Sequence, residues 1–329
     1  TGNAPGNDMR FYNERVEANR NFANKVWNAS RFILMNMEDK VISKPDDVDL
    51  TLADKWILSK VNTLAKDVTD NMDKFDLGIA VQKVYDFIWD EFCDWYIELV
   101  KYRIYHAADN YKSANAALWT LKTVLGNALK MLHPFMPFVT EEIYSALIPE
   151  EESLMISSWP VFEEGWAFPE AEMVTDHMKE VIRGVRNARA EMNVPPSRKA
   201  KVYIVCEDKE LQDGLAELAV SACPLMNASE LAIQSDKKGI AEDAVSIVVP
   251  DAVAYVPLEE LIDFAQEIER LTKEEEKLKK ELARVNGMLN NEKFMSKAPQ
   301  AKIEEEKAKL EKYQQMMAQV QERLTGLKK

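Results

Sequence analysis

Cysteine, histidine and glycine are all scarce in this sequence, with three, three and ten copies among 329 residues. The histidines lie at no metal-ligand or triad spacing, and no glycine-rich loop or nucleophile elbow is present. We therefore expect no metal, no bound cofactor and no catalytic site in this chain. The three cysteines are too scattered for a metal knuckle or a disulfide framework: Cys93, Cys206 and Cys223. We expect them to be reduced thiols of a cytoplasmic protein.

Long apolar runs are missing as well. No stretch approaches the roughly 20 apolar residues that a membrane-spanning helix needs, and no secretory leader is visible. The chain opens on Thr1–Asn7 without an initiator methionine, and this stretch has the composition of a linker. We expect residues 1–8 to connect the chain to a preceding domain, and the length favours two or three domains overall.

The charge is negative overall but unevenly distributed. The net charge is −14, whereas residues 271–329 carry 14 Lys/Arg against 10 Asp/Glu. That stretch therefore has a balance of +4 and the remainder −18. A basic segment on an acidic body suggests a polyanionic partner for the segment. Alternatively, the alternating Glu and Lys only keep an exposed helix soluble.

The basic stretch belongs to a segment with two long runs of heptad periodicity. Only Glu275 and Glu306 interrupt the apolar register, and the break at 290–299 ends in Pro299. We predict an antiparallel coiled-coil arm over 258–329, about 40 Å long. The apolar positions follow steps of three and four residues: Leu261, Phe264, Ile268, Leu271, Leu278, Leu282, Val285 and Leu289, then Ile303, Leu310, Tyr313, Met317, Val320, Leu324 and Leu327.

Residues 9–150 read as an antiparallel bundle of four or five helices. Helices are predicted over 9–37, over 51–72 from a capping box at Thr51, from Asp76, and from Ser113 to 146 with an interruption at His133–Phe138. Asparagine is a poor helix former, yet three recur on the first helix: Asn21, Asn24 and Asn28. Their amides either bond neighbouring helices inside the bundle or read bases.

Residues 151–257 are predicted to contain a helix and a small α+β unit. The helix spans 171–192 and carries Lys179, Arg183 and Arg186 on one face, either as a phosphate-binding stripe or as a solvated face. The period then changes to two over 201–206, with further strands at 231–233, 245–249 and 252–256 and a helix at 211–220. The chain is thus predicted to be mainly α.

Several long motifs resemble one known family. Three of them are similar to the anticodon-binding bundle of class I valyl-, isoleucyl- and leucyl-tRNA synthetases: NFANKVWNASRF at 21–32, WDEFCDWY at 89–96 and HPFMPF at 133–138. The narrower resemblance is to the valyl enzymes, carried by Val185–Arg186, EMNVPPS at 191–197, and Phe294 with Lys297–Pro299 near the predicted arm tip. The resemblance covers essentially the whole chain.

The resemblance implies an RNA-binding role. It identifies the chain as the C-terminal half of such an enzyme, lacking the catalytic and editing domains and inactive alone, while the full enzyme uses ATP with Mg to attach valine to tRNA. The resemblance assigns a base contact to Lys25 and base stacking to Phe32, with four weaker candidates: Asn28, Arg31, Arg10 and Arg15. Arg284 and Lys309, at similar levels of the hairpin, would grip the outer corner of the tRNA. We expect a monomer, and the rival interpretation is a chaperone-like coiled-coil protein with protein clients.

Overall fold

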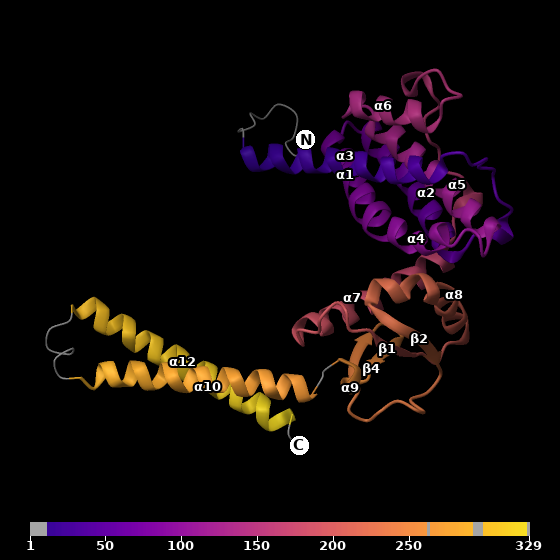
Figure 1. The fold of residues 1–329 in the computed structure, drawn as a ribbon. Helices are drawn as coiled ribbons and strands as arrows, with labels where there is room; N and C mark the ends of the chain where they lie inside the picture. Colours follow the sequence, from indigo (N-terminus) through magenta and orange to yellow (C-terminus); the bar gives the residue numbers. More distant parts are fainter. Residues whose placement is uncertain (1–11, 262–263, 292–298, 328–329) are drawn as a thin grey trace. The chain divides into compact units, whose positions relative to one another are not determined.

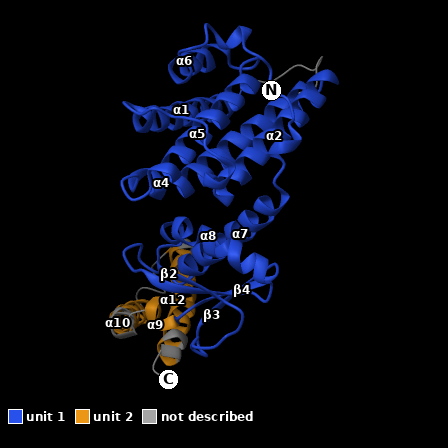
Figure 2. Cartoon of the chain, turned by 90° about the vertical axis from the view of Figure 1, so that its right-hand side faces the viewer, with its two compact units in different colours: residues 1–257 blue, residues 258–329 orange. Residues whose placement is uncertain are grey.

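A computed structural model describes residues 12–261, 264–291 and 299–327. The chain divides into two compact units, residues 1–257 and 258–329, coloured separately in Figure 2. The fold is mainly helical with one small mixed sheet, as predicted (Figure 1). Within the described residues, no helix is both long and apolar enough to span a membrane. The expected boundary at residue 150 stays a prediction.

The first part of unit 1 is a bundle of long helices joined by short connections. Three single 3₁₀ turns lie in its loops: η1 (Asp47–Asp49), η3 (Leu154–Ile156) and η4 (Glu164–Trp166). The bundle's helical elements are α1 (Asn13–Met37), α2 (Leu52–Asp73), α3 (Leu77–Asp86), the π-helical segment η2 (Phe87–Tyr96), α4 (Ile97–Tyr105), α5 (Tyr111–Leu132) and α6 (Pro137–Leu147).

Local signals set where these helices begin. Thr51 and Asp54 form the predicted capping box at the start of α2, with each side chain accepting from the other's backbone N–H. The Asn110 side chain caps α5 by accepting from the Ser113 N–H. The His133–Phe138 motif separates α5 from α6, because Pro134 and Pro137 cannot continue a regular helix. His133 is buried there and its Nδ1 lies 2.8 Å from the Thr140 hydroxyl.

The third predicted helix differs from expectation in its middle. It runs from Leu77 to Tyr105, but ten residues, Phe87–Tyr96, are wound as a π-helix. The wider winding carries a dense run of aromatic residues past α1 and α2 and still buries Phe92 and Tyr96 completely. Phe87, Phe92, Trp95 and Tyr96 are buried in the core, whereas Trp89 is only half-buried.

A charged cluster is buried inside the bundle. Asp54, which caps α2, is fully buried and its Oδ1 accepts hydrogen bonds from Tyr96 Oη at 2.7 Å and Arg103 Nη1 at 2.8 Å. Burial acts to raise the pKa of Asp54, but the charge and hydrogen bonds of Arg103, with those of Tyr96 and Thr51, bring it below its usual value. The cluster joins α2, η2 and α4.

The remainder of unit 1 contains α7 (Pro169–Glu191), α8 (Lys209–Met226) and a four-stranded sheet in the order β2-β1-β4-β3. β1 (Ala200–Val205) pairs parallel with β2 (Ala228–Gln234), while β4 (Ala252–Val256) pairs antiparallel with β1 and with β3 (Val245–Val249). The strands predicted at 245–249 and 252–256 are confirmed, and they pair as a hairpin. Gly184 lets α7 approach β3 closely, because a β-carbon there would overlap the Ile247 side chain.

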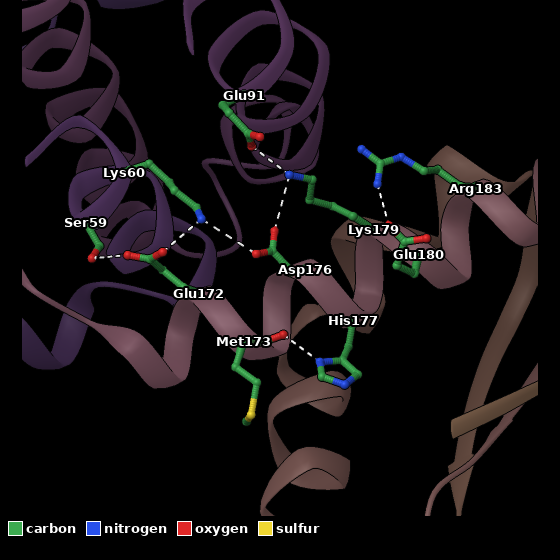
Figure 3. A network of polar contacts seen from close by, with 10 residues as sticks. All are labelled: Ser59, Lys60, Glu91, Glu172, Met173, Asp176, His177, Lys179, Glu180 and Arg183. Atoms are coloured by element: carbon green, nitrogen blue, oxygen red, sulfur yellow. Dashed lines mark hydrogen bonds and ion pairs between the residues drawn. The ribbon is translucent and has the colours of Figure 1, made fainter. Parts of the chain in front are cut away.

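The basic face of α7 is solvated only in part, because Arg183 and Arg186 are exposed whereas Lys179 is buried. Lys179 is neither solvated nor free for phosphate: it is 3% exposed, and its Nζ lies 2.6 Å from Glu91 and 3.3 Å from Asp176 (Figure 3). Arg186 donates to the Leu225 carbonyl oxygen and lies over the Trp95 ring. These cations attach α7 to η2 and α8, because they lie where α7 packs on its neighbours.

Unit 2 consists of the short helix α9 (Leu258–Leu261) and an antiparallel hairpin of α10 (Phe264–Leu289) and α12 (Gln300–Leu327). The two long helices lie side by side (Figure 1). The predicted apolar register forms the seam between them, with a buried cluster of Leu271, Leu278, Met317, Val320 and Leu324. Glu275, an interruption of that register, accepts a hydrogen bond from Gln321 across the hairpin at 3.2 Å.

Candidate nucleic-acid interface

Three of the predicted RNA-binding residues share one side of α1. Lys25, Asn28 and Phe32 are spaced i, i+3 and i+7, which places them within two turns of a helix and on the same face. Asn21, Asn24 and Asn28 are all exposed, so the alternative in which these amides bond helices inside the bundle is wrong. The buried stripe of α1 is formed instead by Phe22, Val26, Ala29, Ser30 and Ile33.

Lys25 lies between an acid and an aromatic ring of η2. Its Nζ is 2.6 Å from Asp94 Oδ1 and 3.8 Å from the centroid of the Trp89 ring. Trp89 belongs to a stack with Tyr85 and Phe22, whose ring centroids are 4.4 to 6.4 Å apart. The ammonium group is therefore positioned by a cation–π contact and one ion pair. Because Asp94 is half exposed, exchanging this partner for RNA costs little.

The surface of η2 beside Lys25 is acidic. Asp86 at the end of α3 and Asp90 and Asp94 in η2 recur every four residues, close to one π-helical turn. Partial burial raises the pKa of Asp90, and the neighbouring charges of Asp86 and Asp94 raise it further. These carboxylates repel phosphate, and Lys25 offsets part of their charge. The arrangement favours a contact with a base or a single phosphate at Lys25.

Phe32 lies two turns further along α1 and contacts α4. It is half-buried, its ring meets Tyr105 edge to face at a centroid separation of 6.4 Å, and Lys101 Nζ is 5.8 Å from its centroid. Sequence reasoning did not single out Trp89, Asp94, Lys101 or Tyr105 as parts of this surface. Trp89 and Asp94 belong to the WDEFCDWY motif, but nothing local places any of these four residues beside α1, because they reach it only through the packing of η2 and α4.

The weaker candidates of α1 are not all brought together. Asn28 and Arg31 are exposed near Phe32. Arg15 is exposed too, with its guanidinium over the Tyr12 ring at 5.3 Å, but it stands ten residues from Lys25, or about 15 Å along the helix. Arg10 lies outside the described residues. The face around Lys25, Asn28 and Phe32 is therefore the centre of the candidate site, and we call it the α1 face.

In the arm, Arg284 and Lys309 share a carboxylate neighbourhood. Arg284 is ion-paired with Glu281 at 2.9 Å, and Lys309 with Glu305 at 2.6 Å and Glu306 at 2.9 Å. The hydrogen bond and charge of Glu281 raise the pKa of Arg284, and Glu306 on the opposite helix adds to the same effect.

The expectation that both cations stand at similar levels of the hairpin agrees with their common proximity to Glu306. Both side chains remain partly exposed. Phe294 and Lys297 lie outside the described residues.

Glu306 is an interruption of the apolar register with an energetic cost. It is 4% exposed, and its Oε2 is buried without a hydrogen-bond partner, while its Oε1 accepts from Lys309. An unsatisfied buried oxygen costs about 1–3 kcal/mol. The carboxylate therefore lowers the stability of the arm while it positions Lys309.

We expect Glu306→Leu to stabilise the arm by about 1–3 kcal/mol, because an apolar side chain fits the seam and removes the unsatisfied oxygen. Hydrogen–deuterium exchange of α10 and α12 amides measures this locally, as slower exchange. Glu305→Leu is the matched control, since Glu305 contacts the same Lys309 from an exposed position and should leave exchange unchanged. Faster exchange in the Glu306 variant would show that the carboxylate stabilises the hairpin.

Comparisons with known proteins match both units of the chain. Residues 54–204 match a family model described as the anticodon-binding domain of tRNA ligase, and residues 263–328 match the valyl tRNA synthetase tRNA binding arm. The first match begins after α1, so the α1 face precedes it. The second covers most of unit 2, including Arg284 and Lys309.

Relatives named valine–tRNA ligase align along the chain. That of Clostridium perfringens is 49% identical over 328 residues, covering 99% of this chain and 37% of the relative. That of Clostridium acetobutylicum is 48% identical over 334 residues, with 100% and 37% covered, and that of Carboxydothermus hydrogenoformans is 42% identical over 310 residues, with 94% and 35% covered.

The chain thus spans little more than a third of the length of these relatives. The chaperone-like alternative receives no support from any of these matches. An anticodon-binding domain model, a binding-arm model specific to valyl enzymes, and close to half identity along the whole chain agree with one another. The chain belongs to the valyl-tRNA synthetase family.

Proposed function

We propose that this chain is the tRNA-recognition portion of a valine–tRNA ligase, with the α1 face contacting the anticodon and the arm contacting the outer corner of a valine tRNA. The observation that carries the proposal is the presence of two matched modules together with the α1 face, where Lys25 and Phe32 are partly exposed beside aromatic rings. Aromatic faces stack on unpaired bases, and amides and ammonium groups bond their edges.

The two surfaces have different roles in this proposal. Phosphate contacts fix position and register, whereas base contacts carry sequence information. Arg284 and Lys309 have partly exposed carboxylate partners, Glu281 and Glu305, which phosphates can replace at low cost, and Lys309 pairs in addition with the buried Glu306. Lys25 and Asn28 present hydrogen-bonding groups next to the half-buried ring of Phe32, a combination that suits a base. The arm supplies affinity and the α1 face supplies selectivity.

The whole enzyme would supply the bond-making chemistry. In that enzyme valine and ATP, with Mg, would form an adenylate, and the valyl group would pass to the acceptor end of the tRNA. This chain would contribute orientation: binding energy at the anticodon and the corner holds the tRNA so that its acceptor end reaches a catalytic domain. We propose further that the enzyme is a cytoplasmic monomer.

Binding selectivity tests the proposal. The chain should bind a valine tRNA transcript more tightly than the same transcript with an altered anticodon. Lys25→Ala and Phe32→Ala should each bind the two RNAs about equally, because a base contact or a stacked base contributes roughly 1–3 kcal/mol, or about 5- to 150-fold in affinity. Filter binding at fixed salt measures the ratio.

Trp27→Leu is the control for these variants. Trp27 is exposed on α1 but points away from Lys25, since two residues along a helix turn by about 200°. It should keep both affinity and discrimination. If Lys25→Ala and Phe32→Ala retain the wild-type preference for the cognate anticodon, the assignment of the α1 face is refuted. If the unaltered chain prefers neither RNA, the proposed function itself is refuted.

A further inference from the structure

The end of α4 presents a group of exposed aromatic rings. Tyr105 is 64% exposed and Tyr102 40%, and His106 stacks on Tyr102 with ring centroids 4.1 Å apart and planes at 24°. The His106 ring is also held by Tyr102, whose carbonyl oxygen lies 2.8 Å from its Nδ1. Exposed rings that are ordered against one another are available for stacking without a large entropic cost.

Tyr105 adjoins the predicted stacking residue of the α1 face. The Tyr105 and Phe32 rings are perpendicular, at 89°, with centroids 6.4 Å apart. The two adjacent rings therefore form a corner, because their planes are perpendicular. Tyr105 therefore offers a second, differently oriented stacking surface beside Phe32.

A cation completes this corner. Lys101 Nζ lies 5.8 Å from the Phe32 centroid, and its ion pair with Glu98 at 2.6 Å is a partly exposed i,i+3 contact. Such pairs contribute less than about 1 kcal/mol, so Lys101 can exchange Glu98 for another anion. Two ring faces with an adjacent exchangeable ammonium group fit a base and its phosphate, the repeating chemistry of single-stranded RNA.

We propose that Tyr105 stacks on an unpaired base next to the base at Phe32 and that Lys101 binds a phosphate of the same loop. The proposal rests on the proposed function, because it places the anticodon loop at Phe32. It enlarges the α1 face to a surface shared by α1 and α4, in which two successive bases are stacked at right angles. The ligand is RNA in its single-stranded form, and not a duplex.

The test uses the whole chain and a valine tRNA anticodon stem–loop carrying 2-aminopurine in the loop. Without the tRNA corner, this RNA isolates the surface on unit 1. Tyr105→Leu should lower affinity roughly 5- to 100-fold and reduce the fluorescence change on stacking, while Tyr105→Phe keeps both, because the ring remains. Lys101→Gln should reduce the slope of log affinity against log salt by about one.

A similar pair elsewhere in unit 1 provides the control. Lys66 Nζ also lies 5.8 Å from an aromatic centroid, that of Phe162. Helix α2 meets α4 where Asp54 pairs with Arg103, and Lys66 lies twelve residues further along α2 from Asp54. That separation is about 18 Å. Phe162→Leu should therefore bind the stem–loop like the unaltered chain, and an equal loss in this variant would overturn the assignment to Tyr105.

The outcomes separate the two proposals. If the unaltered chain fails to bind the stem–loop, the proposed function fails. If it binds and Phe32→Ala weakens it, but Tyr105→Leu binds within twofold of the unaltered chain, only the present inference is overturned. Because Tyr105 is largely exposed, its variants should fold normally; the Lys101→Gln salt slope tests the same surface without removing a ring.

Discussion

Reversing the charges of Arg284 and Lys309 together should weaken binding of a whole valine tRNA roughly 50-fold at 0.1 M salt. Each lost phosphate contact removes about one from the slope of log affinity against log salt, so two contacts remove about two. The two cations share proximity to Glu306, and glutamates in their place would add two carboxylates to the one already present in this small region of the hairpin. Filter binding across a salt series measures both quantities.

A second pair of reversals tests location rather than net charge. Lys273→Glu with Lys277→Glu changes the charge of the arm by the same amount, but these lysines stand eleven and seven residues from Arg284 on α10, about 17 and 10 Å away. These two reversals should weaken tRNA binding less than the Arg284–Lys309 reversals do. They should also reduce the slope of log affinity against log salt by less. An unchanged slope in the Arg284–Lys309 variant would show that the arm does not contact phosphate at this level.

Asp54→Asn should reduce the free energy of unfolding of unit 1 by about 3–5 kcal/mol at pH 7. Its Oδ1 accepts from Arg103 and Tyr96, and its Oδ2 accepts from the Thr51 N–H at 2.9 Å. An amide cannot balance the guanidinium charge, and its NH₂ group would face a donor. Removing one partner of a buried ion pair leaves the other charge uncompensated, and this lowers the free energy of unfolding by about 3–5 kcal/mol. All seven tryptophans lie between residues 27 and 166, so their fluorescence in a urea titration reports unit 1 alone.

The pH dependence should change in the same variant. The pKa of Asp54 is lowered in the folded chain, so its contribution to stability is fully present above the ordinary carboxyl range and disappears as the pH falls through the lowered folded value. The unaltered chain should lose this part of its stability in acid, and Asp54→Asn should already lack it at pH 7. The two unfolding free energies should therefore approach each other as the pH falls.

Asp67→Asn is the matched control on the same helix. Asp67 pairs with Lys83 at 2.7 Å, but both side chains are 41% exposed. Solvent screens such a pair, and its loss should cost less than about 1 kcal/mol. If Asp54→Asn proved as mild as Asp67→Asn, the buried cluster would not be a major source of stability for the bundle.

Family membership and the two RNA-contacting candidates of the α1 face were accessible from motifs in the sequence, but their surroundings were not. Lys25 and Phe32 could be named because their neighbours along α1 form a recognisable motif. Their contacts come from residues 64 to 73 positions away: Trp89 and Asp94 at Lys25, and Lys101 and Tyr105 at Phe32. No spacing rule connects positions so far apart.

The sequence by itself determined the features that depend on neighbours within a turn or a pleat. The capping box at Thr51, the proline break at His133–Phe138, the hairpin at 245–256 and the apolar seam of the arm all follow from local period and local hydrogen bonding. Glu306 could likewise be recognised as an exception to the seam, although its unsatisfied oxygen could not.

Only the tertiary structure decided which charges are exposed. Lys179 and Arg183 occupy one face of the same helix, yet Lys179 is buried between Glu91 and Asp176 while Arg183 remains half exposed. Likewise, the π-helical winding of Phe87–Tyr96 depends on fitting large rings against α1 and α2. Helical periodicity states which residues share a face, but the free energy of burying that face depends on what packs against it, and distant parts of the chain supply that partner.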